Sequence, residues 1–424
     1  MAAVTDEVQE AAASLWHHPD FLKLWAGQTI SLAGSQVTGL ALPLIAILVL
    51  KADALQMGVL RSVQYAPFVL ISLIAGVWID RVRRRQLLIG SDIGRAVLLG
   101  SIPVVILLGG RWMAYLYVIG FAVGLLTVIF NIAYQAHLPS LVDRHHLVEG
   151  NSKLEASRSL TQVAGPSLGG LFVELFSPPV AIFIDAASFL VSAISLKWIR
   201  APEPEPEKSE RNAWQELREG FAFIWAQPLI RLVAASTATV NLALAMAQAV
   251  YILFMSQDLA FSPLLLGLVL AGGGAGGLAG AATARHVVRL VGFGFTVAGA
   301  IGLAGLGLLV TALAGAVPGP AFPLVAGGQL LMSYGLIVYN VSQFSLWQQT
   351  TPAPLRGRVS ATFHFIIWGV LPIGSLLGGV IGSVVSLRTL IGIAAGCVIL
   401  SAAWIAISVS GTVRESPAAP DAGG

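Results

Sequence analysis

Residues 57–85 read MGVLRSVQYAPFVLISLIAGVWIDRVRRR. The first part, 57–79, is predominantly apolar, and the stretch then changes to one acidic and four basic residues within 80–85. About twenty apolar residues are needed for a helix to cross the hydrocarbon core of a bilayer. Clusters of arginine mark the side of the membrane on which such a helix ends. The stretch therefore predicts a transmembrane helix followed by a basic loop.

The same pattern recurs along the chain. Of the 424 residues, 56% are hydrophobic and 11% are charged, whereas soluble domains are about 25% charged. Because a soluble fold cannot bury so much apolar surface, we expect an all-α membrane protein with twelve transmembrane helices. The expected spans are 22–48, 57–79, 87–109, 114–136, 152–174, 179–198, 229–254, 262–284, 290–314, 320–345, 359–383 and 388–409.

Basic residues are distributed unequally between the two sides of this predicted bundle. Membrane proteins concentrate Lys and Arg in their cytoplasmic loops. One side holds only Lys51, Arg111 and Arg388. We therefore expect both termini in the cytoplasm and the chain in the inner (plasma) membrane. The fifteen basic residues of the other side are Arg81, Arg83, Arg84, Arg85, Arg144, Lys153, Lys197, Arg200, Lys208, Arg211, Arg218, Arg285, Arg289, Arg356 and Arg358.

A long polar connection divides the chain in two. It contains alternating Pro and Glu over 201–207, which favours an extended spacer. Over 212–226, Trp214, Leu217, Phe221 and Ile224 have helical spacing, which predicts an amphipathic helix on the membrane surface. The expected division is a cytoplasmic segment 1–20, a six-helix bundle 21–198, the linker 199–228, a second six-helix bundle 229–410 and a tail 411–424.

The two bundles share a sequence pattern at a constant offset. Gly58 corresponds to Gly267, and Gly165, Gly169 and Gly170 correspond to Gly374, Gly378 and Gly379, all at an offset of 209. Residues 21–25 resemble 229–233 at an offset of 208. A common offset near half the chain length indicates a parallel duplication with an even number of helices in each half.

The charged loop after 57–79 has two interpretations. Asp80 follows the C-terminal end of a predicted helix, where the helix dipole disfavours an anion. Its carboxylate needs a partner, either the adjacent arginines or the N-terminus of another helix. The loop is therefore either a basic stop signal that fixes topology or a cytoplasmic latch that forms and breaks between conformations.

This loop resembles a motif of the major facilitator superfamily, Gly-x-x-x-Asp-Arg-x-Gly-Arg-Arg/Lys. The chain departs from it at Arg83, which replaces the second glycine. Twelve helices in two parallel repeats are also typical of that superfamily. The resemblance implies that Asp80 contacts the eleventh helix, after Arg358, and stabilises the outward-open state. The matching positions are Gly76, Asp80, Arg81, Arg84 and Arg85.

The predicted fifth helix carries a second motif, Gly165-Pro166-Ser-Leu-Gly169-Gly170. Proline bends a helix, and glycines let another helix approach closely, so packing alone is one explanation. The segment also resembles the superfamily's antiporter motif, Gly-Pro-x-x-Gly-Gly, which is associated with exporters. Further fragments at 21–25, 92–95, 151–158 and 355–359 resemble the branch of macrolide-efflux and enterobactin-export proteins.

Ionisable residues within spans are costly and commonly functional. Asp92 with Arg95, and Glu155 with Arg158, lie three residues apart and can pair on one helix face. These pairs are either structural or part of transport. Asp185 has no nearby cation in the sequence, and an isolated buried carboxylate can exchange a proton during a transport cycle.

Polar residues nearer the middle of the spans are candidates for the substrate cavity. Arg61 and Gln64 have the chemistry to receive an anionic substrate. The others either contact substrate or form hydrogen bonds between helices. They are Gln36, Asn241, Gln248, Asn340 and Gln343.

Several classes of protein are excluded by motif. The glycines of 272–277 fit a dinucleotide fingerprint but lie inside an apolar span with no preceding strand, and no P-loop sequence is present. His145 and His146 have no further metal-ligand cluster beside them, and the single cysteine, Cys397, excludes a disulfide framework. The N-terminal residues lack the pattern of a cleaved signal peptide. We expect no cofactor, no metal, no nucleic-acid partner and no enzymatic activity.

Taken together, these patterns predict a proton-coupled exporter of an amphipathic small molecule, such as a drug-like compound or a siderophore, that works as a monomer by alternating access. Three alternatives remain open at this level. They are a lipid or metabolite facilitator of the same fold, the membrane subunit of a primary pump, and a membrane sensor without transport.

Overall fold

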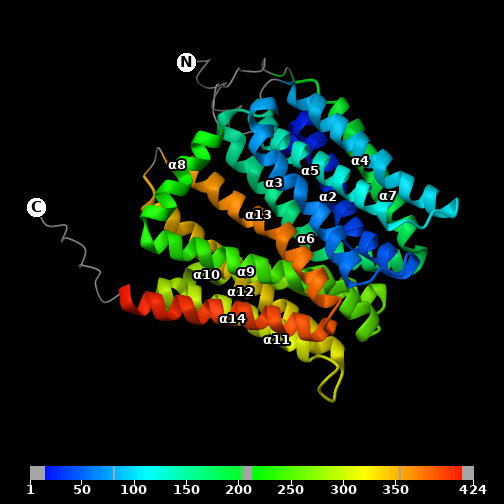
Figure 1. Cartoon of the computed structure of the whole chain (residues 1–424). Helices are drawn as coiled ribbons and strands as arrows, with labels where there is room; N and C mark the ends of the chain where they lie inside the picture. Colours follow the sequence, from blue (N-terminus) through cyan, green and yellow to red (C-terminus); the bar gives the residue numbers. More distant parts are fainter. Residues whose placement is uncertain (1–14, 80–81, 202, 204–212, 353–354, 413–424) are drawn as a thin grey trace, which may run out of the picture.

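The computed structural model describes residues 15–79, 82–201, 203, 213–352 and 355–412, and these are almost entirely helical (Figure 1). Short 3-10 segments, η1 (Leu15–His17) and η3 (Arg144–His146), precede the first and fifth long helices. The helices are α2 (Pro19–Leu44) with a π-helical end η2 (Ile45–Val49), α3 (Ala54–Ile79), α4 (Arg84–Leu107), α5 (Met113–Leu141), α6 (Leu147–Phe176), α7 (Pro178–Lys197), α8 (Ala213–Ala226), α9 (Pro228–Leu253) with a π-helical end η4 (Phe254–Asp258), α10 (Pro263–Val291), α11 (Phe293–Leu313), α12 (Ala321–Thr350), α13 (Arg356–Gly382) and α14 (Leu387–Thr412).

The expected all-helical architecture is confirmed, whereas the count of twelve membrane spans stays a prediction. Each predicted span falls on one of the long helices. Among the described residues, ten of these helices are long and apolar enough to cross a membrane: α2, α4, α5, α7 and α9 to α14. The two others are α3, which ends next to residues outside the described part, and α6, whose first half carries charged side chains at 149, 153, 155 and 158.

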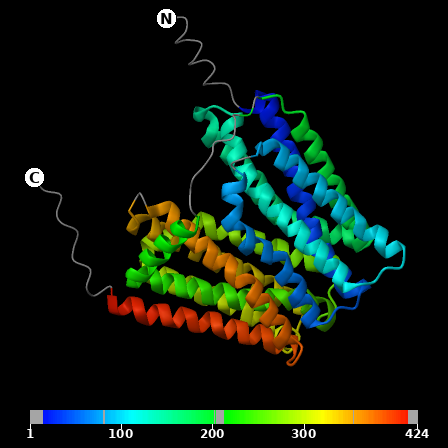
Figure 2. The ribbon, with the colours of Figure 1, turned by 45° about the horizontal axis from the view of Figure 1, so that its top comes forward.

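The helices form two bundles with the same internal packing (Figures 1 and 2). In the N-terminal half, α2 packs on α6 and α7, α4 packs on α5 and α7, and α3 packs on α5. In the C-terminal half, α9 packs on α13 and α14, α11 packs on α12 and α14, and α10 packs on α12. Each contact of one half thus has its counterpart seven helices later, as a duplicated bundle requires.

The first helix of each half ends in the same local geometry. Both α2 and α9 widen into a π-helical turn, at 45–49 and 254–258. Lys51 and Ala260, which follow these turns, have positive φ angles of 57° and 51°. Asp53 and Ser262 then accept hydrogen bonds from backbone N–H groups in the first turns of α3 and α10. These pairs all share the offset of 209 found in the sequence.

The halves contact each other through α3 with α13 and α6 with α10. Gly58 meets Gly379 so closely that a Cβ added at Gly58 would lie 2.5 Å from the Cα of Gly379. In the symmetry-related pair, a Cβ added at Gly170 would lie 3.1 Å from the Cα of Gly267. Glycine is required here because only a bare backbone permits this approach.

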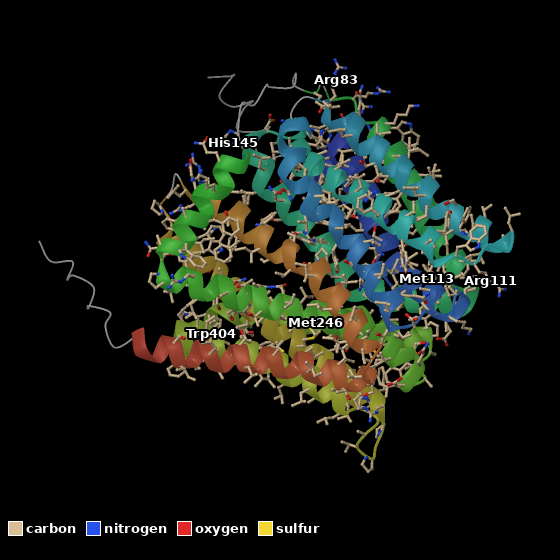
Figure 3. All side chains as sticks on the ribbon, viewed as in Figure 1. Arg83, Arg111, Met113, His145, Met246 and Trp404 are labelled. Atoms are coloured by element: carbon tan, nitrogen blue, oxygen red, sulfur yellow. The ribbon has the colours of Figure 1, made fainter. Side chains whose placement is uncertain are left out.

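We call the end where α2 begins and α14 ends the proximal end, and the opposite end the distal end. Figure 3 shows Arg83 and His145 at the proximal end and Arg111 at the distal end. One hydrophobic core joins both halves around the distal glycine contacts, whereas separate cores lie in each half towards the proximal end. The ribbons of the two halves accordingly diverge towards the proximal end (Figures 1 and 2).

The linker helix α8 lies at the proximal end of the C-terminal half. Its Leu217 and Ile224 are buried, and its Phe221 ring meets Phe365 of α13 edge to face, with centroids 6.3 Å apart. Glu219 forms an ion pair with Arg358 at the start of α13. Trp225 is 71% exposed. An amphipathic helix is therefore present where the spacing predicts one, with its apolar face against α13 and α9.

Candidate functional site

A cavity of about 180 Å³ lies between the two halves. The N-terminal half contributes Gly39 of α2 and Arg61 of α3. The C-terminal half contributes Gln248 and Tyr251 of α9, Gln329 of α12 and apolar side chains of α9 to α12. Because its walls come from both bundles, any relative movement of the halves changes this cavity.

Arg61 is the cation of this cavity. Its guanidinium carbon lies 5.9 Å from the centroid of the Tyr65 ring, one turn along α3. Tyr65 and Phe68 in turn meet Trp368 of α13, the latter as a stacked pair with centroids 4.4 Å apart. This aromatic group fixes the α3 face that carries Arg61 against the other half.

The other predicted cavity residues are dispersed. The Gln36 side chain packs against Gly165 of α6, and the Gln64 side chain packs against Gly120 of α5, both inside the N-terminal half. Asn241 donates to the Thr237 carbonyl of its own helix at 2.9 Å. Gln343 accepts from the Thr237 hydroxyl at 2.7 Å and donates to Asn340 at 3.1 Å, which joins α9 to α12. Of the whole set, Arg61 and Gln248 line the cavity.

A buried ionic cluster lies inside the N-terminal half. Asp92 and Arg95 of α4 form an ion pair, with side chains 0% and 6% exposed. The Arg95 guanidinium lies between the rings of Phe130 and Phe189, 4.3 Å and 4.2 Å from their centroids. Asp185 of α7 is within electrostatic range of Arg95, so it is not the isolated carboxylate that its sequence neighbours suggest.

The cluster is not fully satisfied by protein groups. Asp185 accepts from the Ser188 hydroxyl at 3.0 Å through Oδ1. The Thr38 and Ser192 hydroxyls lie near Asp185 and Asp92, respectively. Oδ2 of each carboxylate and Nε of Arg95 nevertheless have no hydrogen bond of regular geometry among the described residues. Buried polar atoms in proteins are nearly always paired, and exceptions commonly indicate function. By contrast, Glu155 and Arg158 on α6 are both exposed and have no ion pair with each other in the described structure.

The glycine-proline segment of α6 packs on helices of both halves. Gly165 and Gly169 face Gln36 and Val37 of α2, and a Cβ added at Gly169 would lie 3.1 Å from the Cα of Val37. Gly170 faces α10 of the other half, as does the carbonyl of Pro166. The motif thus places α6 between its own bundle and the partner bundle.

The charged loop is described in part. Gly76 lies in α3, and Asp80 and Arg81 lie outside the described residues. Arg84 donates to the Ala136 carbonyl at 2.9 Å, and Arg85 donates through Nε to the Leu196 carbonyl at 3.0 Å. These two arginines therefore bind carbonyl groups near the ends of α5 and α7 in their own half.

A hydrogen-bonded contact closes the distal end. Glu174 near the end of α6 accepts from the Ser262 hydroxyl and from the backbone N–H of Leu264, both at 2.8 Å. Leu264 lies in the first turn of α10, where unpaired N–H groups and the helix dipole favour an anion. A side chain of one half thus caps a helix of the other.

Three polar residues of the interface were not predicted. Glu174 is the last residue of the predicted span 152–174 and resembles an ordinary loop carboxylate in sequence. Gln329 and Tyr251 lie within predicted apolar spans, where each is one of several polar side chains, and its polar group is the only signal that it gives. That signal is the same one that Gln36 and Asn241 give, so sequence alone does not separate cavity residues from packing residues.

Comparisons with known proteins agree with this architecture. The sequence model of the Major Facilitator Superfamily matches residues 24–372. The multidrug efflux pump Tap of Mycolicibacterium fortuitum is 26% identical over 384 residues, which cover 85% of this chain and 88% of Tap. Macrolide efflux protein A of Streptococcus pyogenes is 22% identical over 209 residues, which cover 48% of this chain and 51% of that protein. The resemblance to macrolide-efflux proteins is thereby confirmed.

Solved transporter structures share the fold. The structure of a bacterial homologue of the iron transporter ferroportin in an inward-facing state has a TM-score of 0.72 at 20% identity, covering 93% of this chain and 98% of that chain. The structure of a bacterial homologue of ferroportin in an outward-facing state has a TM-score of 0.58 at 21% identity, covering 92% of this chain and 99% of that chain. In the part of this chain that the structure describes, no group of three or more His, Cys, Asp or Glu could hold a metal ion.

Proposed function

The chain belongs to the Major Facilitator Superfamily, and from this premise we propose that it is a proton-coupled exporter of an amphipathic small molecule. Export is favoured by relatives that are named efflux pumps. In this proposal all twelve long helices span the membrane, both termini are cytoplasmic, and one chain is the working unit. Drug-like compounds and siderophores are the expected substrate classes.

Alternating access is supported by the asymmetry between the two ends. The halves share one hydrophobic core at the distal end and have separate cores at the proximal end. The higher TM-score with the inward-facing homologue fits the same state. We assign the structure to an inward-facing conformation, in which the paired glycines at 58 and 379 and at 170 and 267 close the outer side.

The orientation rests on basic residues. Arg83, Lys197, Arg200 and Arg358 all lie at the proximal ends of their helices or in the adjoining loops. Since Lys and Arg are retained on the cytoplasmic side, the proximal end is the cytoplasmic one. The latch role of Asp80 against the start of α13 remains part of this proposal.

Proton coupling is assigned to Asp185, with Asp92 and Arg95 as its charge partners. Two carboxylates face one guanidinium in a site from which water is almost excluded. Protonation of one carboxylate removes the excess negative charge, and such neutralisation is favoured in a low-dielectric interior. Ser188 and Gly34 surround Asp185, so a change at this carboxylate reaches α2 as well as α7.

The test is flux in proteoliposomes with an imposed pH gradient. Vesicles loaded with a panel of neutral, anionic and cationic fluorescent amphiphiles are diluted into acidic buffer, and the release of each probe is measured. Wild-type protein should release at least one probe faster with the gradient than without it, and a protonophore should abolish the difference. Asp185→Asn should lose this acceleration while retaining exchange of the probe at equal pH.

Asp258→Asn is the matched control, because Asp258 is an exposed carboxylate at the distal end. It should pump at the wild-type rate. Gradient-driven release by Asp185→Asn at the wild-type rate would contradict the coupling assignment. Release of every probe without any effect of the gradient would indicate a facilitator, and dependence on ATP would indicate a primary-pump subunit.

A further inference from the structure

We propose that the cavity between the halves receives the oxyanion head group of an amphiphilic substrate, a carboxylate or a sulfonate, with Arg61 as its counter-ion. The inference rests on the proposed transport function and names the substrate class of its site. It starts from a cation without an anion. Among the described residues, no carboxylate lies within ion-pair distance of the Arg61 guanidinium.

An unpaired cation inside a membrane protein is costly unless it serves a ligand. Arg61 lies seven residues into α3, about 10 Å from the distal end of the helix at 1.5 Å per residue. Gly58, one turn closer to that end, is closed against α13. The guanidinium therefore faces the cavity on the proximal side of the closed contact between Gly58 and α13.

The opposite wall supplies further hydrogen-bonding groups. Tyr251 is 6% exposed and Gln329 is 9% exposed, and Gln329 Oε1 has no hydrogen-bond partner among the described residues. The Tyr251 hydroxyl lies beside the Thr311 side chain, which donates its own proton to the Gly307 carbonyl at 3.1 Å. The hydroxyl can donate, and the amide can present either its nitrogen or its oxygen after a half-turn. Gln248 is exposed to the same cavity. A guanidinium, a phenol and two amides can together donate to each oxygen of an oxyanion.

The size of the cavity fits a head group rather than a whole substrate. Its volume is about 180 Å³, whereas pockets for complete drug-sized ligands measure about 300–1,000 Å³. Leu270 and Met332 are among its apolar walls, and these suit the first carbons of a hydrophobic tail. Gly39 also faces open space, because a Cβ added there meets nothing within 4 Å.

The site is divided between the moving parts. Arg61 belongs to the N-terminal half, and Gln248, Tyr251 and Gln329 belong to the C-terminal half. A bound oxyanion therefore bridges the halves while the distal end is closed. Opening of the distal end separates the cation from the other donors, which weakens binding at the stage of the cycle where an exporter must release its substrate.

The experiment measures binding to the purified full chain in detergent. The probes are dansyl-aminoundecanoate, the sulfonate of the same chain length, the uncharged primary amide and the corresponding primary amine. Wild-type protein should bind the carboxylate or the sulfonate about tenfold or more tightly than the amide, as expected for hydrogen bonds to a charged group. The amine should bind most weakly, and the relative affinities of the two acids identify the preferred oxyanion.

Arg61→Gln should abolish the preference for the acids while leaving affinity for the amide unchanged. Arg111→Gln, at an exposed arginine in the distal loop, is the matched control and should keep the preference. Gly39→Leu should fold, because its side chain enters open space, and should weaken all four probes by filling the cavity. Tyr251→Phe should weaken the binding of the two acids more than the binding of the amide.

Equal affinity for acid and amide in the wild type, or an unchanged acid preference in Arg61→Gln, would overturn the inference. Failure of the proposed function can be distinguished from failure of this inference. Acid-selective binding without gradient-driven flux would reject proton-coupled export but retain the oxyanion site. Gradient-driven export of cationic probes alone would reject the oxyanion site but retain the transporter.

Discussion

Arg95 is enclosed by groups that leave its charge almost no access to water. Phe130 and Phe189 cover its two faces, and Asp92 binds its edge. A buried ion pair contributes little to stability compared with apolar packing, but removal of one partner leaves the other charge unpaired. We therefore expect a large loss of stability when Arg95 alone is replaced, and a smaller loss when Asp92 and Arg95 are replaced together.

Arg95→Met should lower the free energy of unfolding by about 3–5 kcal/mol, because Asp92 and Asp185 then lose their cation. The measurement is thermal unfolding in detergent. The double variant Asp92→Asn with Arg95→Met should recover part of the loss. Arg158→Met, at an exposed arginine of α6, should change stability by no more than about 0.5 kcal/mol. Equal melting temperatures for Arg95→Met and Arg158→Met would contradict this account.

At the scale of helices, closure of the distal end depends on how α6 and α10 meet. The carboxylate of Glu174 caps α10 across the boundary between the halves. Among the described residues, the symmetry-related contact between α3 and α13 has no such cap across the boundary. There Asp53, which belongs to the N-terminal half, caps α3 of the same half. One of the two distal contacts therefore includes a charge, and the other rests on glycine packing.

Glu174→Gln should weaken distal closure by about 1 kcal/mol, the usual size of a charge-assisted helix cap, which corresponds to about a fivefold shift towards the open state. Spin labels at Arg111→Cys and Val317→Cys, in a chain with Cys397→Ala, report the distance between the distal ends of the two halves. Asp53→Ala removes a cap of similar strength within one half. It should leave the distance distribution unchanged, and an equal shift in both variants would assign the effect to general helix fraying.

For the whole molecule, the proposed alternating access requires that the two bundles separate at the distal end. Glu174→Cys with Ser262→Cys, in a chain with Cys397→Ala, places one thiol on each half at their hydrogen-bonded contact. Joining them with a short, cleavable bifunctional thiol reagent should abolish flux, and cleavage should restore it. Either single-cysteine variant should transport at the same rate with and without the reagent. Full flux in the cross-linked protein would contradict alternating access about this contact.

Much of the fold follows from local sequence patterns. Apolar runs predict each long helix because a membrane span must satisfy its own backbone hydrogen bonds within the helix. The offset of 209 predicts that Gly58 corresponds to Gly267 and Gly170 to Gly379. The contacts between the halves, 58 with 379 and 170 with 267, are seen only in the structure. The spacing of Asp92 and Arg95 predicts their ion pair, because residues three apart share a helix face.

The sequence by itself determined the helices, their grouping by repeat and the side that holds the basic loops, since hydropathy and loop charge act locally. The tertiary structure alone decided which polar residues meet. It directs Gln36, Gln64 and Asn241 into their own bundles and assembles Arg61, Tyr251 and Gln329 around one cavity. The reason is physical: a side chain's partner depends on which helix face turns towards the other half, and contacts between distant segments set that rotation.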